Sequence, residues 1–316
     1  MIRVTLIAGG VGGAKMAEGL QALEDVALTV IGNIADDDDF HGLWVSPDID
    51  TMLYTLSGRI NRAQGWGVED EGRRALETLA ELGAPTWMFL GDRDFGLHIY
   101  RSQRLARGDR PSLVTADIAE RFGVRAKIVL PSDDRVQTRV RTAEGWLSFQ
   151  EYFVRERCTP EVLELRYEGM EAARATQEAR DAIAGADVII IAPSNPLVSI
   201  APITGIAGIT EALKAARAPL LAVSPLIAGR VVKGPADKMM ASLGLRADAL
   251  GVAEGYAGLA QHMVIDTQDR ALSPAIRALG LTPHATDILM PDLAAKTRLA
   301  RQALSFARAR PAGQAA

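Results

Sequence analysis

The turn Gly9-Gly10-Val11-Gly12-Gly13 constrains the fold of this chain more than any other segment. It follows the apolar, β-branched run 3–8 and precedes apolar residues at helical spacing. A second apolar run, 28–31, ends at Gly32-Asn33, so residues 3–33 are predicted to form a βαβ unit. Backbone N–H groups and the positive end of the helix at such a turn favour an anionic phosphate. A tight turn without a ligand is the alternative.

The same pattern returns late in the chain. The apolar run 188–192 ends at Pro193-Ser194-Asn195-Pro196, and the run 220–225 follows a helical stretch. We therefore predict an α/β protein with a Rossmann-like parallel sheet and helices on both faces. The segment 60–110 has helical spacing, whereas 127–149 alternates like an antiparallel hairpin. We expect one domain, 1–316, with an inserted helical and hairpin lobe at about 60–180 that covers the active site.

Composition excludes several classes of protein. The 35 Lys and Arg residues are outnumbered by 39 Asp and Glu and are spread along the chain, so no nucleic acid partner is expected. No stretch approaches the ~20 apolar residues of a membrane span. The only cysteine, Cys158, has no intrachain partner, as is usual in a reducing compartment. We expect a cytoplasmic protein.

Six carboxylates lie within the short segment 36–50. Such a group repels itself unless it is solvated or shares a cation, and Mg²⁺ prefers oxygen ligands. A solvated acidic loop is the alternative for the run 36–39. The pair in Pro47-Asp48-Ile49-Asp50-Thr51 is the more specific signal, because it follows a turn and precedes a helical segment.

Two further segments carry polar side chains between glycines or prolines. In 90–98, Arg93 could grip a phosphate or another polar ligand, although Asp92 or Asp94 could equally cap a helix. The turn 193–196 could read a nucleobase or sugar edge, or could simply end a strand. We expect a packing or hydrogen-bonding role for His98, and a surface position for Lys233.

The ordered motifs GGVGGAK, NIADDDDFHGLWVSPDIDT, LGDRDFGLHI, APSNPLVSI and SPLIAGRVVKGPA together resemble the 2-phospho-L-lactate transferase family of coenzyme F420 biosynthesis. The resemblance implies a homodimeric phosphotransferase that requires Mg²⁺. Its donor is a three-carbon acid activated by GDP, and its acceptor is the deazaflavin Fo (7,8-didemethyl-8-hydroxy-5-deazariboflavin). The ribityl terminal hydroxyl of Fo would receive the phosphate-bearing group, with release of GMP and formation of F420-0 or its dehydro form.

The resemblance also implies roles for individual residues. Asp50 and Arg93 would contact Fo, and Asp50 is the catalytic candidate, expected to be an exposed carboxylate. Asp50 is also the candidate for metal binding, with Asp36 and Asp48 as further candidates for sharing the metal, although the resemblance does not identify which carboxylates bind it directly. The nucleotide would be held by Gly9, Gly10, Gly12, Gly13, Lys15, Ser194, Asn195 and Pro196.

Three questions stay open at the level of sequence. The donor acid could be 2-phospho-L-lactate, phosphoenolpyruvate or 3-phosphoglycerate, because the turn has Gly13-Ala14-Lys15 where archaeal relatives tend toward threonine and proline before the lysine. A nucleotide-sugar-binding regulator of the gluconeogenesis-factor type is an alternative function. A nicotinamide-dependent dehydrogenase is a third, disfavoured because Asn33 stands where a ribose-binding carboxylate is expected.

Overall fold

The centre of the protein is a seven-stranded parallel sheet. The computed structural model describes residues 1–308. In spatial order the strands are β14 (Thr282–Thr286), β13 (His262–Asp266), β10 (Leu220–Val223), β9 (Val188–Ile191), β1 (Ile2–Ala8), β2 (Val26–Gly32) and β5 (Lys127–Val129). This confirms the predicted Rossmann-like α/β class.

Alternation along the strands sends apolar side chains to both faces of the sheet. In β9, Val188 and Ile190 belong to one core, and Ile189 and Ile191 belong to the other. The first core is covered by α1 (Gly10–Gln21), α2 (Pro47–Leu56), α4 (Asp92–Ala106), α5 (Pro111–Arg121) and α12 (Leu293–Arg308). The second is covered by α6 (Gln177–Ala184), α7 (Ala201–Thr204), α8 (Ile209–Ala215), α10 (Ala249–Tyr256) and α11 (Ser273–Ala278). Helices therefore lie on both faces, as predicted.

The middle of the chain differs from the predicted single lobe. The strand β5 pairs in parallel with β2 at the edge of the central sheet, so it divides the segment 60–180 into two parts. The first part is helical and consists of α3 (Arg74–Glu81), α4 and α5. The second is an antiparallel sheet of β6 (Gln137–Thr142), β7 (Gly145–Ser148) and β8 (Glu164–Glu168). The prediction that 127–130 forms one arm of the hairpin is wrong, because that arm is β6.

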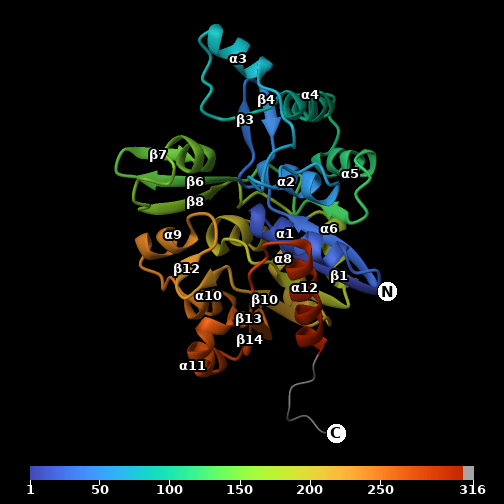
Figure 1. Ribbon diagram of the computed structural model, residues 1–316, viewed down its shortest axis with the longest axis vertical. Coiled ribbons are helices and arrows are strands. Elements are labelled where there is room, and N and C mark those ends of the chain that lie inside the picture. The colour runs from blue at the N-terminus through green and yellow to red at the C-terminus, as the bar shows by residue number, and fades with distance from the viewer. Residues whose placement is uncertain (309–316) are drawn as a thin grey trace.

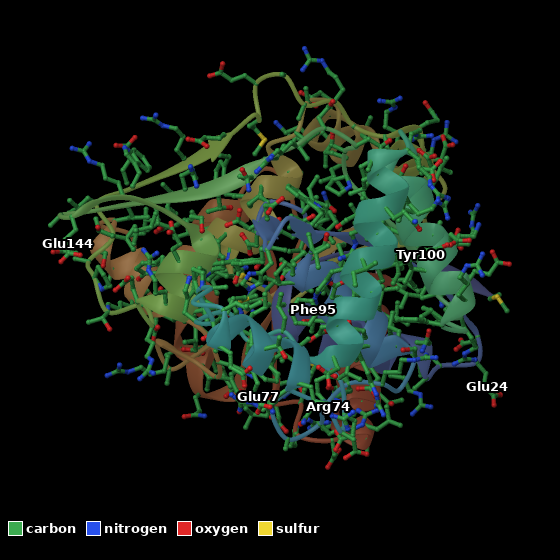
Figure 2. All side chains as sticks on the ribbon, turned by 90° about the horizontal axis from the view of Figure 1, so that it is seen from above. Glu24, Arg74, Glu77, Phe95, Tyr100 and Glu144 are labelled. Carbon is green, nitrogen blue, oxygen red and sulfur yellow. The ribbon has the colours of Figure 1, made fainter. Side chains whose placement is uncertain are left out.

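Smaller elements surround the carboxyl ends of the strands. The hairpin of β3 (Asp38–Phe40) and β4 (Leu43–Val45) packs with α3 and α4 around Phe40 and Phe95, at the upper end of Figure 1. The hairpin β6–β7 extends outward to Glu144, whereas Phe95 lies near the middle of the view from above (Figure 2). The remaining elements are β11 (Leu226–Ile227), β12 (Arg230–Val231), α9 (Ala236–Ser242), the π-helical turns η1 (Glu151–Arg155) and η2 (Pro196–Ile200), and the 3₁₀ helix η3 (Thr267–Leu272). Within residues 1–308, no helix combines the length and apolarity needed to cross a bilayer.

Candidate active site

A cavity of about 490 Å³ opens at the carboxyl ends of β1 and β9. The chain leaves β1 toward β2 on one side, whereas β9 lies on the other side of β1. The strand order thus reverses between β1 and β9, and open α/β sheets bind ligands at such a switch point. The cavity is lined by the glycine turn, the acidic loop, α4 and the segments 193–199 and 231–236.

The glycine turn is held tightly against the turn that follows β9. Gly10 has φ of +61° where α1 begins. A Cβ at Gly12 would lie 2.1 Å from the carbonyl oxygen of Pro193. The Ser194 hydroxyl donates to the Gly9 carbonyl at 2.7 Å and accepts from the Gly9 N–H at 3.3 Å. Packing within the protein therefore requires glycine at Gly12, whether or not a ligand also approaches the backbone.

Most of the predicted nucleotide-binding residues line the cavity. Those that do are Gly9, Gly10, Gly12, Lys15, Ser194 and Asn195. Gly13 does not line it, because it lies beneath the turn against Ala8 and Ser194. Pro196 also lies outside the lining, at the start of a π-helical turn that Asn195 caps by accepting from the Leu197 N–H at 3.0 Å. Their nucleotide role stays a prediction.

Two carboxylates of the acidic segment meet beside the glycine turn. Asp48, in the first turn of α2, accepts a 2.9 Å hydrogen bond from the Asn33 amide, and burial raises the pKa of Asp48 to about 6. Burial, and then the charge of Asp48, raise the pKa of Asp36 well above its usual range. The Asp36 Oδ1 atom is buried and has no hydrogen-bond partner. A Cβ at Gly9 would lie 2.5 Å from Asp48 Oδ2, so the carboxylate is close to the turn where phosphate is expected.

Asp50 is not the exposed carboxylate that the sequence suggested. Its residue is only 5% exposed, and both its oxygens face the buried guanidinium of Arg101 on α4. The Ser46 N–H donates a further 3.3 Å hydrogen bond to Asp50 Oδ2. His98 Nδ1 lies 3.8 Å from the same oxygen, and burial lowers the pKa of His98 to about 4, so the imidazole is neutral at pH 7.

The face of α4 toward the cavity carries residues that sequence reasoning missed as site residues. Asp94 and His98 line the cavity, and Arg101 lies one turn further along the helix. Asp94 accepts a 2.7 Å hydrogen bond from the buried Tyr54 hydroxyl, and burial raises the pKa of Asp94 to about 6. Their spacing of four and three residues places them on one helical face, which is a signal that was available in the sequence.

Arg93 lies elsewhere. It is exposed, its N–H donates to Glu71 at 2.7 Å, and its guanidinium donates to the Glu69 carbonyl at 2.8 Å. The side chain borders a separate surface groove with Arg59 and Arg121 and does not line the cavity. The predicted contact between Arg93 and Fo stays a prediction without geometric support.

The three carboxylates predicted to bind metal do not gather as one group. Asp50 is paired with Arg101, and residues 1–308 contain no cluster of three or more His, Cys, Asp or Glu side chains arranged to hold a metal. Asp36 and Asp48 remain together, and the unpartnered oxygen of Asp36 suits a cation. Mg²⁺ commonly binds through one or two carboxylates plus the phosphates of a substrate, so this pair fits such a site.

Aromatic side chains also line the cavity. Phe149 and Phe153 stack with ring centroids 5.5 Å apart, and Trp66 meets Phe89 edge to face at 6.3 Å. Trp87 completes this wall. Flat rings and apolar surface favour a planar ligand. Composition alone did not predict this wall, because its members come from three segments that are distant in sequence.

Asn33 stands at the position expected to hold a ribose in a dinucleotide fold, and its amide group is used in hydrogen bonds within the protein. The Asn33 amide donates to Asp48 and, at 3.1 Å, to the Val198 carbonyl, and its oxygen accepts from the Ala35 N–H. Asn33 is fully buried. This arrangement does not support the dehydrogenase alternative.

Fold and cavity together define a Rossmann-like α/β protein whose switch point carries a glycine turn and aromatic side chains in one cavity. The sequence model of a protein family, described as "2-phospho-L-lactate transferase CofD", matches residues 4–301. The chain therefore belongs to the 2-phospho-L-lactate transferase CofD family, and it is an enzyme of transferase type in coenzyme F420 biosynthesis.

Individual relatives span nearly the whole chain. "Phosphoenolpyruvate transferase" from Streptomyces griseus subsp. griseus is 41% identical, with 97% of this chain and 98% of the relative covered. "2-phospho-L-lactate transferase" from Methanosarcina acetivorans is 38% identical, with 93% and 96% covered. The crystal structure of protein BH3568 from Bacillus halodurans has a TM-score of 0.63 at 16% identity, covering 96% of this chain and 99% of that one. That likeness shows the fold alone and lends no support to the regulator alternative.

Proposed function

We propose that the protein transfers a phosphorylated three-carbon acid group from its GDP-activated form to the terminal ribityl hydroxyl of Fo. The hydroxyl oxygen forms a bond to the phosphorus that carries the three-carbon group. The bond between that phosphorus and the oxygen of GMP breaks, and GMP leaves. The hydroxyl proton passes to an acceptor in the site.

The observation that carries this proposal is that two unlike sets of residues line one cavity. The glycine turn and Lys15 supply N–H groups and positive charge for the diphosphate of the donor. The wall that includes Trp66, Trp87 and Phe149 suits the flat deazaflavin ring. A single cavity that takes both substrates holds them for direct transfer, which lowers the entropic part of the barrier.

Asp50 is the residue proposed to hold the attacking hydroxyl. A carboxylate offers about four acceptor positions. Arg101 uses two of them and the Ser46 N–H uses one, so one position remains for the substrate. The bidentate contact with Arg101 also fixes the orientation of the carboxylate. Asp94 lines the cavity as well, with a pKa near 6, and is a second acceptor for the proton.

We further propose that Asp36 and Asp48 hold Mg²⁺ together with the diphosphate of the donor. The ion would neutralise negative charge on the transferred and leaving phosphates when bound. Asp36 is buried and Asp48 is half-buried next to the glycine turn, and this supports the role. A homodimeric state and a cytoplasmic location, expected from the resemblance and the sequence, stay predictions.

Product analysis tests the reaction and identifies the donor. The protein is incubated with Fo, GTP, Mg²⁺, a guanylyltransferase that activates the acid, and one three-carbon phosphate at a time. Mass spectrometry should detect GMP and one phosphodiester product of Fo, with phosphoenolpyruvate giving the dehydro form. Relatives named for phosphoenolpyruvate and for 2-phospho-L-lactate are 41% and 38% identical, so both donors, and 3-phosphoglycerate, are tested. Absence of any Fo product with all three acids would exclude the proposed reaction.

A further inference from the structure

Two ammonium groups line the same end of the cavity without a carboxylate partner. Lys15 lies on the second turn of α1, and Lys233 lies in the loop between β12 and α9. Within residues 1–308, Lys15 makes no hydrogen bond or ion pair, although Glu18 is on the same helix. Glu18 is already bonded to Lys296 at 2.6 Å and to Arg62 at 2.8 Å. The acid nearest in sequence is therefore engaged elsewhere.

The two lysines are close enough to influence one another. Burial lowers the pKa of Lys15 and the charge of Lys296 lowers it further, whereas the charge of Glu18 raises it. Lys233 is exposed, as the sequence predicted; partial burial of its ammonium lowers its pKa, and the charge of Lys15 lowers it further. Two like charges facing one partly desolvated cavity are unfavourable unless an anion lies between them.

Lys233 is held beside the glycine turn by the loop 61–67. Its Nζ donates to the Gln64 carbonyl. A Cβ at Gly65 would lie 3.5 Å from that Nζ and 3.3 Å from Val11 Cγ1, so the ammonium is next to the turn. A neutral carbonyl is a weaker partner for an ammonium than a carboxylate is. An incoming carboxylate would therefore replace the Gln64 carbonyl.

We propose that Lys233, assisted by Lys15, binds the carboxylate of the three-carbon acid in the donor, separately from the glycine turn that takes the diphosphate. This inference rests on the proposed function. All three candidate acids carry a carboxylate, whereas GDP does not. Lys233 thus contacts the substrate directly and recognises the class of acid donors against the bare nucleotide.

The alternative partner for Lys233 is the diphosphate itself, and the two readings differ in a measurable way. A lysine that binds the diphosphate contributes equally to GDP and to the acid ester of GDP. A lysine that binds the carboxylate contributes only to the ester. Comparing the two ligands in one variant therefore isolates the carboxylate contact.

The test uses Lys233→Gln, with Lys233→Arg as the conservative variant and Lys238→Gln as the matched control. Lys238 lies on the neighbouring α9, donates to the Cys158 and Thr159 carbonyls, and does not line the cavity. The ligands are GDP, measured by calorimetry, and the ester made from GTP and phosphoenolpyruvate by the guanylyltransferase. Thermal denaturation of each variant checks folding.

Lys233→Gln should raise KM for the ester by about tenfold or more, the loss expected for one charged hydrogen bond, with kcat changed far less. Its Kd for GDP should stay within about twofold of the wild type. Lys233→Arg should recover most of the affinity, and Lys238→Gln should behave as the wild type. An unchanged KM for the ester, or equal weakening of GDP and ester, would overturn the inference.

Failure of the proposed function gives a different result. In that case the wild type forms no Fo product with any acid ester. The carboxylate subsite is then judged by displacement of GDP from the protein by the ester. In the wild type, the ester should bind more tightly than GDP. Loss of this difference in affinity in Lys233→Gln supports the subsite, and an unchanged difference rejects it.

Discussion

Arg101 and Asp50, which are 51 residues apart in sequence, form a buried ion pair behind the cavity. The two side chains are only 4% and 7% exposed. The charge of Asp37 also faces Arg101, so the guanidinium neutralises carboxylates of the acidic segment as well as orienting the catalytic candidate. The pair joins α4 to α2 and thereby connects stability of the fold to the geometry of the site.

Replacing Arg101 by Met should destabilise the protein by about 3 to 5 kcal/mol, because Asp50 would remain buried without its partner. Urea denaturation of the two proteins measures the difference. Arg107→Met is the control, since Arg107 is exposed at the end of the same helix and has no ion pair within the described chain. Its effect should stay within about 0.5 kcal/mol. Equal, small effects of the two substitutions would show that the ion pair contributes little.

Much of the fold follows from local patterns, and the exceptions have physical reasons. β1, β2, β9 and β10 are apolar runs because both of their faces are buried. β14 has the sequence Thr-Pro-His-Ala-Thr and lies at the sheet edge, half exposed, so it has no such run. β5 is a short edge strand whose alternation resembles a hairpin arm. Pairing partners, which are tertiary information, decide the difference.

The site was predictable where a motif directly borders the cavity and not where tertiary contacts decide. The glycine turn apart from Gly13, together with Asp36, Asp48 and Asp50, lines the cavity, as the motifs indicated. The burial of Asp50 was not predictable, because it depends on Arg101 from a distant helix. The aromatic wall was not predictable either, because packing of the loops against one another brings its members together.

Removal of one proposed metal ligand should change the Mg²⁺ requirement. Asp36→Asn and Asp48→Asn should each raise the Mg²⁺ concentration for half-maximal transfer by about tenfold or more, since even outer partners of metal sites alter affinity by about 10- to 100-fold. Asp39→Asn is the matched control, because Asp39 is exposed in the same acidic run. Titration of activity with Mg²⁺ measures the effect. An unaltered Mg²⁺ titration in both variants would place the ion elsewhere.

The pair His262 and His284 should make stability fall in mild acid. Their ring nitrogens are 3.1 Å apart, and His284 stacks on Phe306 with ring centroids at 4.3 Å. Burial, and then the charge of His262, lower the pKa of His284 to about 4, and burial lowers the pKa of His262. The unfolded chain, with an ordinary pKa near 6.5, binds protons first as pH falls. The stabilisation is therefore complete above pH ~6.5 and is lost progressively toward pH ~4.

Melting temperatures of the wild type and of His284→Gln at pH 7.5 and pH 5.0 measure this effect. The decrease in melting temperature between the two pH values should be smaller in the variant, because one of the three histidines with a lowered pKa, His98, His262 and His284, is gone. His41→Asn is the control, since His41 is exposed and asparagine tolerates its φ of +56°. The control should keep the full wild-type decrease. An identical decrease in all three proteins would assign the acid sensitivity to other groups.

Gly12→Ala should disrupt the contact between the glycine turn and the turn after β9. The added methyl group would lie 2.1 Å from the Pro193 carbonyl oxygen, and backbone on both sides leaves little room to move. Overpacking of this kind costs about 1 to 3 kcal/mol. The displaced turn should also bind GDP more weakly, because its N–H groups no longer converge on the phosphate.

Gly255→Ala on α10 is the matched control for Gly12→Ala, since its Cβ would meet nothing within 4 Å. That substitution should leave GDP affinity unchanged and should stabilise the helix by up to about 1 kcal/mol. Urea denaturation and calorimetric titration with GDP distinguish the two variants, and wild-type GDP affinity in Gly12→Ala would show that the turn does not hold the nucleotide.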